Sequence, residues 1–360
     1  MENLANDYYS PYKAVHHRDK INKIRNGDLA LPSYIEVGLT GRCNHNCGMC
    51  IFRNNPFPRN VYQSVEGLNK MDIPLKIISK LAKEMDELKI PAVEITGAGE
   101  PLCHPQIEKV LTEFSKYEIE VALVTNGALL TNKILDCIKN PKWIRISVDA
   151  ASPEVHARVH GVPGQFDKVL DGVVRAVEWA KGYPDVVIGA SFIIQKDNFL
   201  QITNFTELMK SCGVDNVRLA HEVTPKWDEL FNDQEKIKIL NYLKSAKSFE
   251  DKDFRVFAMV DRLPSFHPEP IGVDQCGYQF FAASLSCDCL FYPCCVTKFN
   301  RDYMYGDLRN ESLTEILLGD NRKKLVQTFP YDACEFCYLR EKVKFIDYLC
   351  QSDPPHVNYV

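Results

Sequence analysis

Apolar positions along the first two thirds of the chain follow two alternating patterns. Short, mostly apolar runs of strand length are followed by longer stretches whose apolar residues recur on one helical face. The strand-like runs lie at 33–40, 92–96, 119–125, 143–149, 186–194 and 217–220. The helix-like stretches lie at 74–89, 107–116, 131–139, 166–181, 200–211 and 232–248. Repeated strand–helix units form a parallel sheet with helices outside. The pattern therefore predicts an α/β fold, a partial (β/α)6 barrel.

The pattern changes near Phe254, where the alternation stops and cysteines become dense. Short strand-like pieces follow around 280–292, and a helix-like stretch at 313–326 leads to the pair Cys334 and Cys337. We therefore expect three parts: an N-terminal extension over 1–32, the partial barrel over 33–250 and a small cysteine-rich domain over 251–360.

Charge and composition narrow the class of protein. The 43 basic and 48 acidic residues give a net charge of −5, which argues against a nucleic-acid partner. Apolar runs are too short for a membrane span, and the polar N-terminus lacks the apolar core of a secretory signal. We therefore expect a cytoplasmic protein. In a reducing compartment the 14 cysteines indicate metal binding or catalysis rather than disulfides.

Three cysteines directly follow the first predicted strand. Cys43, Cys47 and Cys50 have the spacing C-x3-C-x2-C, which lets three thiolates from one loop bind three irons of a four-iron cluster. The fourth iron stays open, and an open coordination position usually means chemistry rather than structural support. A zinc site is the alternative.

This loop resembles the signature of the radical S-adenosylmethionine (SAM) superfamily, and the resemblance covers about residues 33–221. It implies a [4Fe–4S] cluster whose open iron binds SAM. Electron transfer to SAM would yield a 5′-deoxyadenosyl radical that abstracts hydrogen from a substrate, with the electron supplied by a flavodoxin- or ferredoxin-type donor. Met49 stands where an aromatic residue usually packs near the adenine, and some sugar-acting members also have methionine there.

Polar or glycine residues end the next three predicted strands, where α/β folds bind ligands. The segment TGAGEP at 96–101 is similar to the family's glycine-rich contact with the SAM amino group. Further positions resemble those that hold the ribose and carboxylate, although turns and helix caps are the alternative for each. The predicted SAM contacts are Met49, Gly97, Gly99, Glu100, Asn126, Ser147 and Asp149.

The C-terminal cysteines resemble the SPASM/Twitch extension of this superfamily. Carried over by position, Cys276, Cys294, Cys334 and Cys337 hold one auxiliary [4Fe–4S] cluster. Cys294 is preferred over its neighbour Cys295, and the cysteine spacing fits the single-cluster Twitch form. A zinc knuckle built from the same thiolates is the alternative.

The resemblance leaves several functions open. Only 42 residues precede Cys43, so we expect no leader-peptide-binding domain and favour a small polar substrate: a sugar, aminocyclitol or nucleoside. The reaction would be a net dehydrogenation, with the auxiliary cluster accepting the second electron. One alternative is a peptide-modifying enzyme, either a crosslinking maturase or an epimerase in which Cys295 or Cys350 returns hydrogen. An alternative from another class is a non-catalytic iron–sulfur electron carrier.

Overall fold

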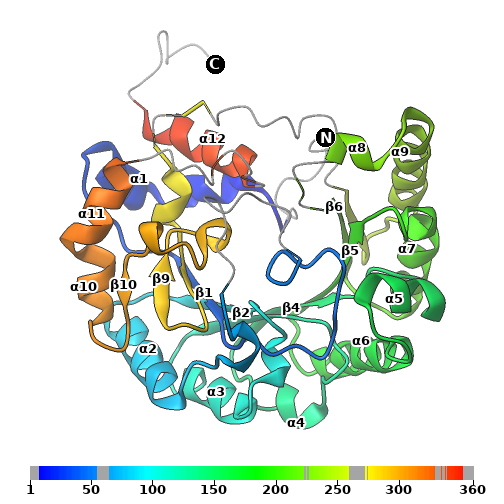
Figure 1. Cartoon of the computed structure of the whole chain (residues 1–360), viewed down its shortest axis with the longest axis horizontal. Coiled ribbons are helices and arrows are strands. Elements are labelled where there is room, and N and C mark those ends of the chain that lie inside the picture. Colours follow the sequence, from blue (N-terminus) through cyan, green and yellow to red (C-terminus); the bar gives the residue numbers. More distant parts are fainter. Residues whose placement is uncertain are drawn as a thin grey trace.

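The computed structural model describes residues 8–54, 65–222, 224, 227–258, 272–273, 275–328, 334, 337 and 339–351. Its centre is one curved sheet with the strand order β10-β9-β8-β1-β2-β3-β4-β5-β6-β7 (Figure 1). The strands are β1 (Tyr34–Gly38), β2 (Ala92–Thr96), β3 (Glu120–Thr125), β4 (Pro141–Ser147), β5 (Val187–Ile194), β6 (Asn216–His221), β7 (Arg255–Ala258), β8 (Ala282–Leu285), β9 (Leu290–Tyr292) and β10 (Gly306–Asp307). Strands β1 to β7 are parallel to their neighbours and β8 is parallel to β1, whereas β9 and β10 are antiparallel additions. The predicted α/β fold with a parallel core is confirmed.

Helices form an arc around the outer face of this sheet (Figure 1). The helices of the described chain are α1 (Arg18–Arg25), α2 (Leu75–Glu87), α3 (Ile107–Phe114), α4 (Asn132–Leu135), α5 (Pro153–His160), α6 (Phe166–Ala180), α7 (Ile202–Ser211), α8 (Trp227–Leu230), α9 (Asp233–Lys247), α10 (Leu313–Leu318), α11 (Asp320–Gln327) and α12 (Arg340–Cys350). Short 3-10 helices occur at η2 (Pro11–His16), η3 (Leu68–Lys70), η4 (Pro101–Cys103), η5 (Phe199–Gln201), η7 (Gly277–Phe280), η8 (Cys295–Thr297) and η9 (Arg301–Tyr303). Within the described residues, no helix is both long and apolar enough to cross a membrane.

The side-chain alternation of each barrel strand separates two environments. On β1, Ile35 and Val37 are fully buried against the helices, whereas Tyr34 and Glu36 lie on the opposite face. This opposite face lines the inside of the partial barrel, because successive side chains of a strand point to opposite faces. The hydrophobic core therefore lies between the sheet and the helices, and the polar side chains of the strands face the lumen of the barrel.

Helix α5 and strand β7 are among the elements that were not predicted. Helix α5 has eight residues, capped by Ser152 with Pro153 at its first position. Strand β7 has four residues and extends the sheet beyond β6. It lies just past residue 250, so the sheet continues across the boundary that we expect between barrel and C-terminal domain. That division stays a prediction.

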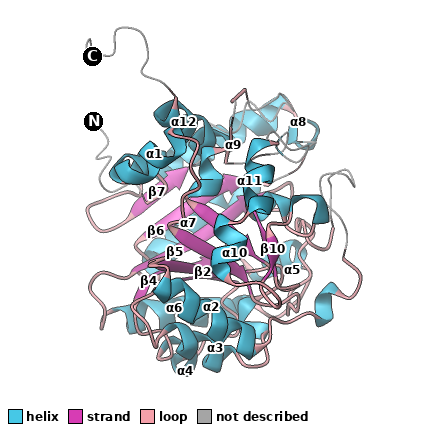
Figure 2. Ribbon diagram, turned by 90° about the vertical axis from the view of Figure 1, so that its left-hand side faces the viewer, coloured by secondary structure: helices cyan, strands magenta, loops and turns pink. Residues whose placement is uncertain are grey.

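The two ends of the described chain meet at one end of the barrel. Helices α1 and α12 pack against each other, and α12 also packs on η2 (Figures 1 and 2). Lys13 and His17 from the first segment and Lys342 from α12 line a cavity together with the first residues of the barrel strands. These elements therefore cover the amino ends of the strands, and the carboxyl ends lie on the opposite side.

Candidate functional site

A cavity of about 300 Å³ lies at the carboxyl ends of the barrel strands. All ten residues predicted for the first cluster and for SAM line it: Cys43, Met49, Cys47, Cys50, Gly97, Gly99, Glu100, Asn126, Ser147 and Asp149. They come from the loop after β1 and from the ends of β2, β3 and β4. The structure thus brings together, in one cavity, side chains separated by more than a hundred residues in sequence. Their individual roles stay predictions.

Backbone contacts hold the cysteine loop against the end of β2. The Gly99 amide donates to the Thr40 carbonyl (2.8 Å), and the Glu100 amide donates to the Arg42 carbonyl (2.8 Å). The Arg42 side chain in turn donates to Asp72 from Nε, with the nearer oxygen at 3.0 Å. These contacts fix the backbone immediately before Cys43. The glycine-rich segment therefore positions the cysteine loop in addition to lining the cavity.

Substitution of Gly99 tests this close approach. A Cβ at Gly99 would lie 2.1 Å from the Arg42 carbonyl oxygen, so the backbone before Cys43 must shift. We expect Gly99→Ala to cost about 1–3 kcal/mol of unfolding free energy, the usual range for overpacking, and to lower iron retention. Gly48→Ala, within the cysteine loop itself, is the matched control, since a Cβ there meets nothing within 4 Å. Thermal unfolding and iron content of both variants measure the effect, and equal behaviour would contradict it.

Burial favours the protonated form of two thiols at the first site, Cys43 and Cys47. Burial raises the pKa of Cys43 and of Cys47, and the negative charge of Asp149 raises the pKa of Cys47 further. Iron binding must therefore displace these protons. Three thiols from one loop around one cavity fit a four-iron cluster with three protein ligands, and the remainder of the cavity is available to SAM.

Three buried histidines pack behind this loop. The ligand nitrogens of His45, His156 and His160 lie within 4.8 Å of one another, and His160 Nδ1 lies 3.1 Å from Cys47 Sγ. Burial lowers the pKa of His45 and His156 to about 4 and that of His160 to about 3. The imidazoles are therefore neutral near pH 7. They form a buried histidine wall beside Cys47, and His45 and His160 also line the cavity.

Glu100 connects β2 to β3 through its carboxylate. It accepts hydrogen bonds from the Thr125 hydroxyl (2.6 Å), the Asn126 amide (2.7 Å) and the Leu102 amide (3.1 Å). Burial raises the pKa of Glu100 to about 7, against the opposing effect of these bonds. The carboxylate thus already has a structural role, and the predicted contact with the SAM ammonium would come in addition to it. The Asn126 side chain also donates to Asn44 Oδ1 in the cysteine loop (2.7 Å).

Asp149 occupies an unusual backbone position at the end of β4. Its φ is 55°, and its Oδ1 accepts from the Ile193 amide (2.7 Å). Burial raises the pKa of Asp149 to about 7, partly opposed by the charge of Arg218. Backbone strain of this kind clusters at functional sites, which agrees with the predicted SAM contact.

Arg145, Arg218 and Gln195 are among the polar side chains at this site that sequence reasoning missed. Arg145 and Arg218 line the cavity and bring positive charge, and Gln195 Nε2 lies 2.7 Å from the sulfur of Met49. Alternate residues of each strand face the lumen, and both arginines stand at such positions. Arg145, for example, lies two residues before Ser147. That alternation was the available signal, because a charged residue inside an otherwise apolar strand must face the lumen.

The structure also gathers the four cysteines predicted for the auxiliary cluster. Burial raises the pKa of Cys276 strongly, and the next causes are the charges of Cys337, Cys294 and Cys334. Cys295 instead acts on Tyr34, Tyr278 and Lys298, beside the lumen. The choice of Cys294 over Cys295 as the ligand stays a prediction. Four converging thiols suit a four-iron cluster or zinc equally in number.

Two family models match the cysteine-bearing parts of the chain. Residues 37–201 match the radical SAM superfamily, and residues 276–338 match the SPASM iron–sulfur cluster-binding domain. A [4Fe–4S] cluster and SAM belong to the first family, and auxiliary iron–sulfur binding belongs to the second. The choice of an iron–sulfur cluster over zinc at both sites follows from these matches.

Similar proteins extend over most of the chain. The tungsten-containing aldehyde ferredoxin oxidoreductase cofactor-modifying protein of Pyrococcus furiosus is 23% identical over 345 residues, covering 89% of this chain and 92% of that protein. The antilisterial bacteriocin subtilosin biosynthesis protein AlbA of Bacillus subtilis is 22% identical over 336 residues, covering 92% of this chain and 69% of that protein.

A solved structure is similar over nearly the whole chain. SuiB of Streptococcus suis bound to SAM aligns with a TM-score of 0.64 at 16% identity, covering 98% of this chain and 83% of SuiB. SuiB bound to its precursor peptide SuiA aligns with a TM-score of 0.60 at 14% identity, covering 98% and 84%. The fold is therefore shared from the cysteine loop through the C-terminal cysteines. The chain belongs to the radical SAM superfamily and carries a C-terminal SPASM domain.

Proposed function

We propose that this radical SAM enzyme modifies a peptide. The observation that carries the proposal is the similarity to AlbA, a bacteriocin biosynthesis protein, over 92% of this chain. The fold shared with SuiB, which has been crystallised with its precursor peptide, supports the same substrate class. The peptide alternative is therefore better supported than the small polar substrate that we expected first.

A small-molecule substrate also keeps support among the relatives. The Pyrococcus furiosus relative is named for modification of a cofactor, and it matches this chain over a similar length. The size of the barrel lumen is compatible with a peptide. A second cavity of about 490 Å³ lies at the other end of the barrel from the 300 Å³ cavity at the cysteines. Such a space can hold a large side chain with its flanking backbone, and small-molecule sites have similar volumes.

Different residues at this site would bind the cluster, exclude water and bind SAM. When bound, the first cluster supplies the electron that cleaves SAM and so generates the 5′-deoxyadenosyl radical that removes hydrogen from the substrate. Cys43, Cys47 and Cys50 would hold the cluster, and the neutral histidine wall would keep water from it. Arg145 and Arg218 offer positive charge to the SAM carboxylate. The electron would come from a separate flavodoxin- or ferredoxin-type protein.

Product analysis separates peptide from small-molecule substrates. Anaerobic holoenzyme with SAM and a low-potential reductant is incubated with short peptides encoded beside its gene, or with the low-molecular-weight fraction of its host. We expect the peptides to raise 5′-deoxyadenosine formation at least tenfold and to lose two mass units, the sign of net oxidation. Unchanged peptide mass with deuterium uptake from solvent would indicate epimerisation instead. Stimulation by the low-molecular-weight fraction alone would overturn the proposal.

A further inference from the structure

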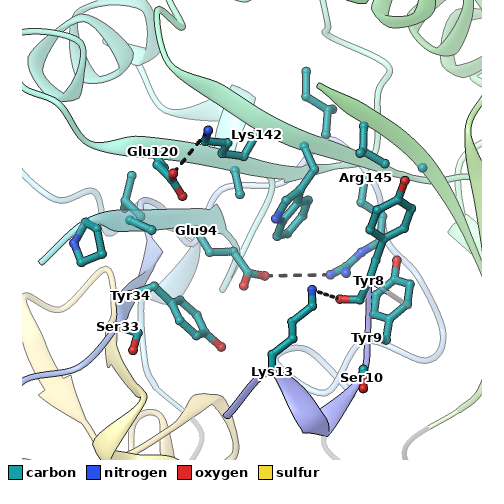
Figure 3. Close-up of a pocket in the computed structure, with 18 of the residues that line it drawn as sticks. Tyr8, Tyr9, Ser10, Lys13, Ser33, Tyr34, Glu94, Glu120, Lys142 and Arg145 are labelled. Atoms are coloured by element: carbon teal, nitrogen blue, oxygen red, sulfur yellow. Dashed lines mark hydrogen bonds and ion pairs between the residues drawn. The ribbon is translucent and has the colours of Figure 1, made fainter. Parts of the chain in front are cut away.

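The second cavity opens at the amino ends of the barrel strands. Tyr34, Ala92, Glu120, Trp143, Val187 and Asn216, each close to the start of a strand, contribute to its wall. Arg145 lines both this cavity and the one at the cysteines, so the two occupy successive levels of one lumen. Figure 3 shows the side chains converging on this space, with Tyr8, Tyr9 and Lys13 reaching it from the N-terminal segment.

The wall combines aromatic rings with charged groups that are mostly paired. Tyr8, Tyr9, Tyr34 and Trp143 supply the rings. Glu120 forms an ion pair with Lys142 at 3.3 Å, and the Lys13 ammonium donates to the Tyr8 carbonyl at 2.8 Å. Rings beside carboxylates are the surroundings in which proteins bind organic cations.

Glu94 is the carboxylate that faces this space with its acceptor capacity unused. Its side chain is 20% exposed, and it accepts no hydrogen bond from any residue that the structure describes. The nearest cation, Arg145, lies 3.9 Å away, beyond hydrogen-bond distance (Figure 3). The Arg145 guanidinium also lies 5.3 Å from the Trp143 ring centre. A carboxylate removed from bulk water without a donor is costly, so this position favours a ligand that supplies one.

The neighbouring carboxylate, Glu36, has a close cationic partner, whereas Glu94 has none that close among the described residues. Glu36 stands opposite Glu94 in the register of β1 and β2. It is in contact with the fully buried ammonium of Lys298, and it accepts from the Ser284 hydroxyl at 3.4 Å. Glu94 instead has the charges of Arg145, Lys298 and Lys342 near it, and among the described residues none of them is in hydrogen-bond contact with it.

The position of Glu94 along β2 determines how long a ligand side chain must be to reach it from the upper cavity. Thr96 lines the upper cavity and Glu94 the lower one, two residues apart on β2, which corresponds to roughly 7 Å along the strand. The four-carbon stem of a lysine spans about this distance. A basic side chain that reaches Glu94 would thus place its own α-carbon beside the predicted SAM site.

We propose that Glu94 selects a peptide substrate whose reacting residue, or its immediate neighbour, has a basic side chain. This proposal rests on the proposed function and narrows it. The lysine ammonium or arginine guanidinium occupies the lower cavity and donates to Glu94, while the rings of Tyr34 and Trp143 cover its stem.

Binding of matched peptides to the SAM-loaded holoenzyme tests the proposal. The probes are acetyl-Gly-Gly-X-Gly-Gly-amide peptides with X as lysine, arginine, acetyl-lysine or glutamate, measured by calorimetry. Acetyl-lysine keeps the stem and loses the charge. We expect the lysine and arginine peptides to bind at least tenfold more tightly than the acetyl-lysine peptide. In Glu94→Gln this preference disappears, and in Glu94→Asp part of it remains.

Glu120→Gln is the control, because Glu120 lines the same cavity but is already paired with Lys142. It should keep the preference, and all variants should keep their iron content. Equal binding of all four peptides to the wild type would overturn the selection while leaving a peptide substrate in place. If no peptide binds, the affinities of the holoenzyme for pentylamine and for pentanol are compared, which tests the cation site alone. Tighter binding of pentylamine that is lost in Glu94→Gln would support the cation site and contradict a peptide substrate. Equal binding of the two probes would overturn the cation site.

Discussion

Replacing Cys43, Cys47 and Cys50 together by alanine is expected to lower the iron content of reconstituted protein from about eight to about four per chain. The same change should abolish 5′-deoxyadenosine formation, because the three thiols line the cavity in which SAM is predicted to bind. The four C-terminal thiols gather around Cys276, apart from this cavity, and should load independently. Iron analysis, electron paramagnetic resonance and chromatography of SAM products measure both effects.

The control removes cysteines that belong to neither group. Cys137 donates its thiol to the Lys133 carbonyl, and Cys212 caps α7. The Cys137→Ala/Cys212→Ala variant should keep about eight irons and full SAM cleavage. A first-site variant without any iron, or one that keeps eight, would contradict the assignment of two separate sites.

The barrel half of this protein could be predicted from its sequence because the signals there are local. Each buried strand reads as an apolar run, and helices such as α2 and α6 are amphipathic over three turns or more. The cavity residues follow from the same pattern, since each lies in the loop after a strand or at a strand's end. Proteins bind ligands at the carboxyl ends of parallel strands, so position along the strand placed these residues in one cavity, and the choice among them came from the family resemblance.

The lower part of the lumen could not be predicted in this way. Glu94 and Arg145 sit inside apolar strands, and their proximity depends on the curvature of the sheet, because β3 lies between their strands. The covering segments come from opposite ends of the chain, as Lys13 and Lys342 show. Contacts of this kind have no local sequence signal. The distinction between Cys294 and Cys295 is similar, because adjacent residues differ only in the direction of their side chains.

Removing the auxiliary site should separate SAM cleavage from product formation. Abstraction of a hydrogen atom leaves the substrate with one unpaired electron, and a net two-electron oxidation requires a second electron and a proton to leave. We expect the Cys334→Ala/Cys337→Ala variant to form 5′-deoxyadenosine with substrate at near wild-type yield and oxidised product at less than a tenth of it. Quantifying both products in single-turnover reactions gives the ratio.

The structure makes this role physically reasonable, because the auxiliary thiols adjoin the lumen. The charge of Glu36, on the lumen face of β1, acts on Cys294, and Lys298 connects the segment after Cys294 to the same glutamate. A cluster there would lie beside the substrate space, with its potential set by burial and by hydrogen bonds to sulfur. Cys350→Ala is the matched control, since Cys350 is a buried thiol of the same region whose pKa responds to Asp347 and Arg25 rather than to the other thiols. It should keep both yields. Circular dichroism must show the double variant folded, because the cluster also supports a small domain. A folded variant that lacks this cluster and still forms product in normal yield would exclude the acceptor role and leave the second cluster a structural one.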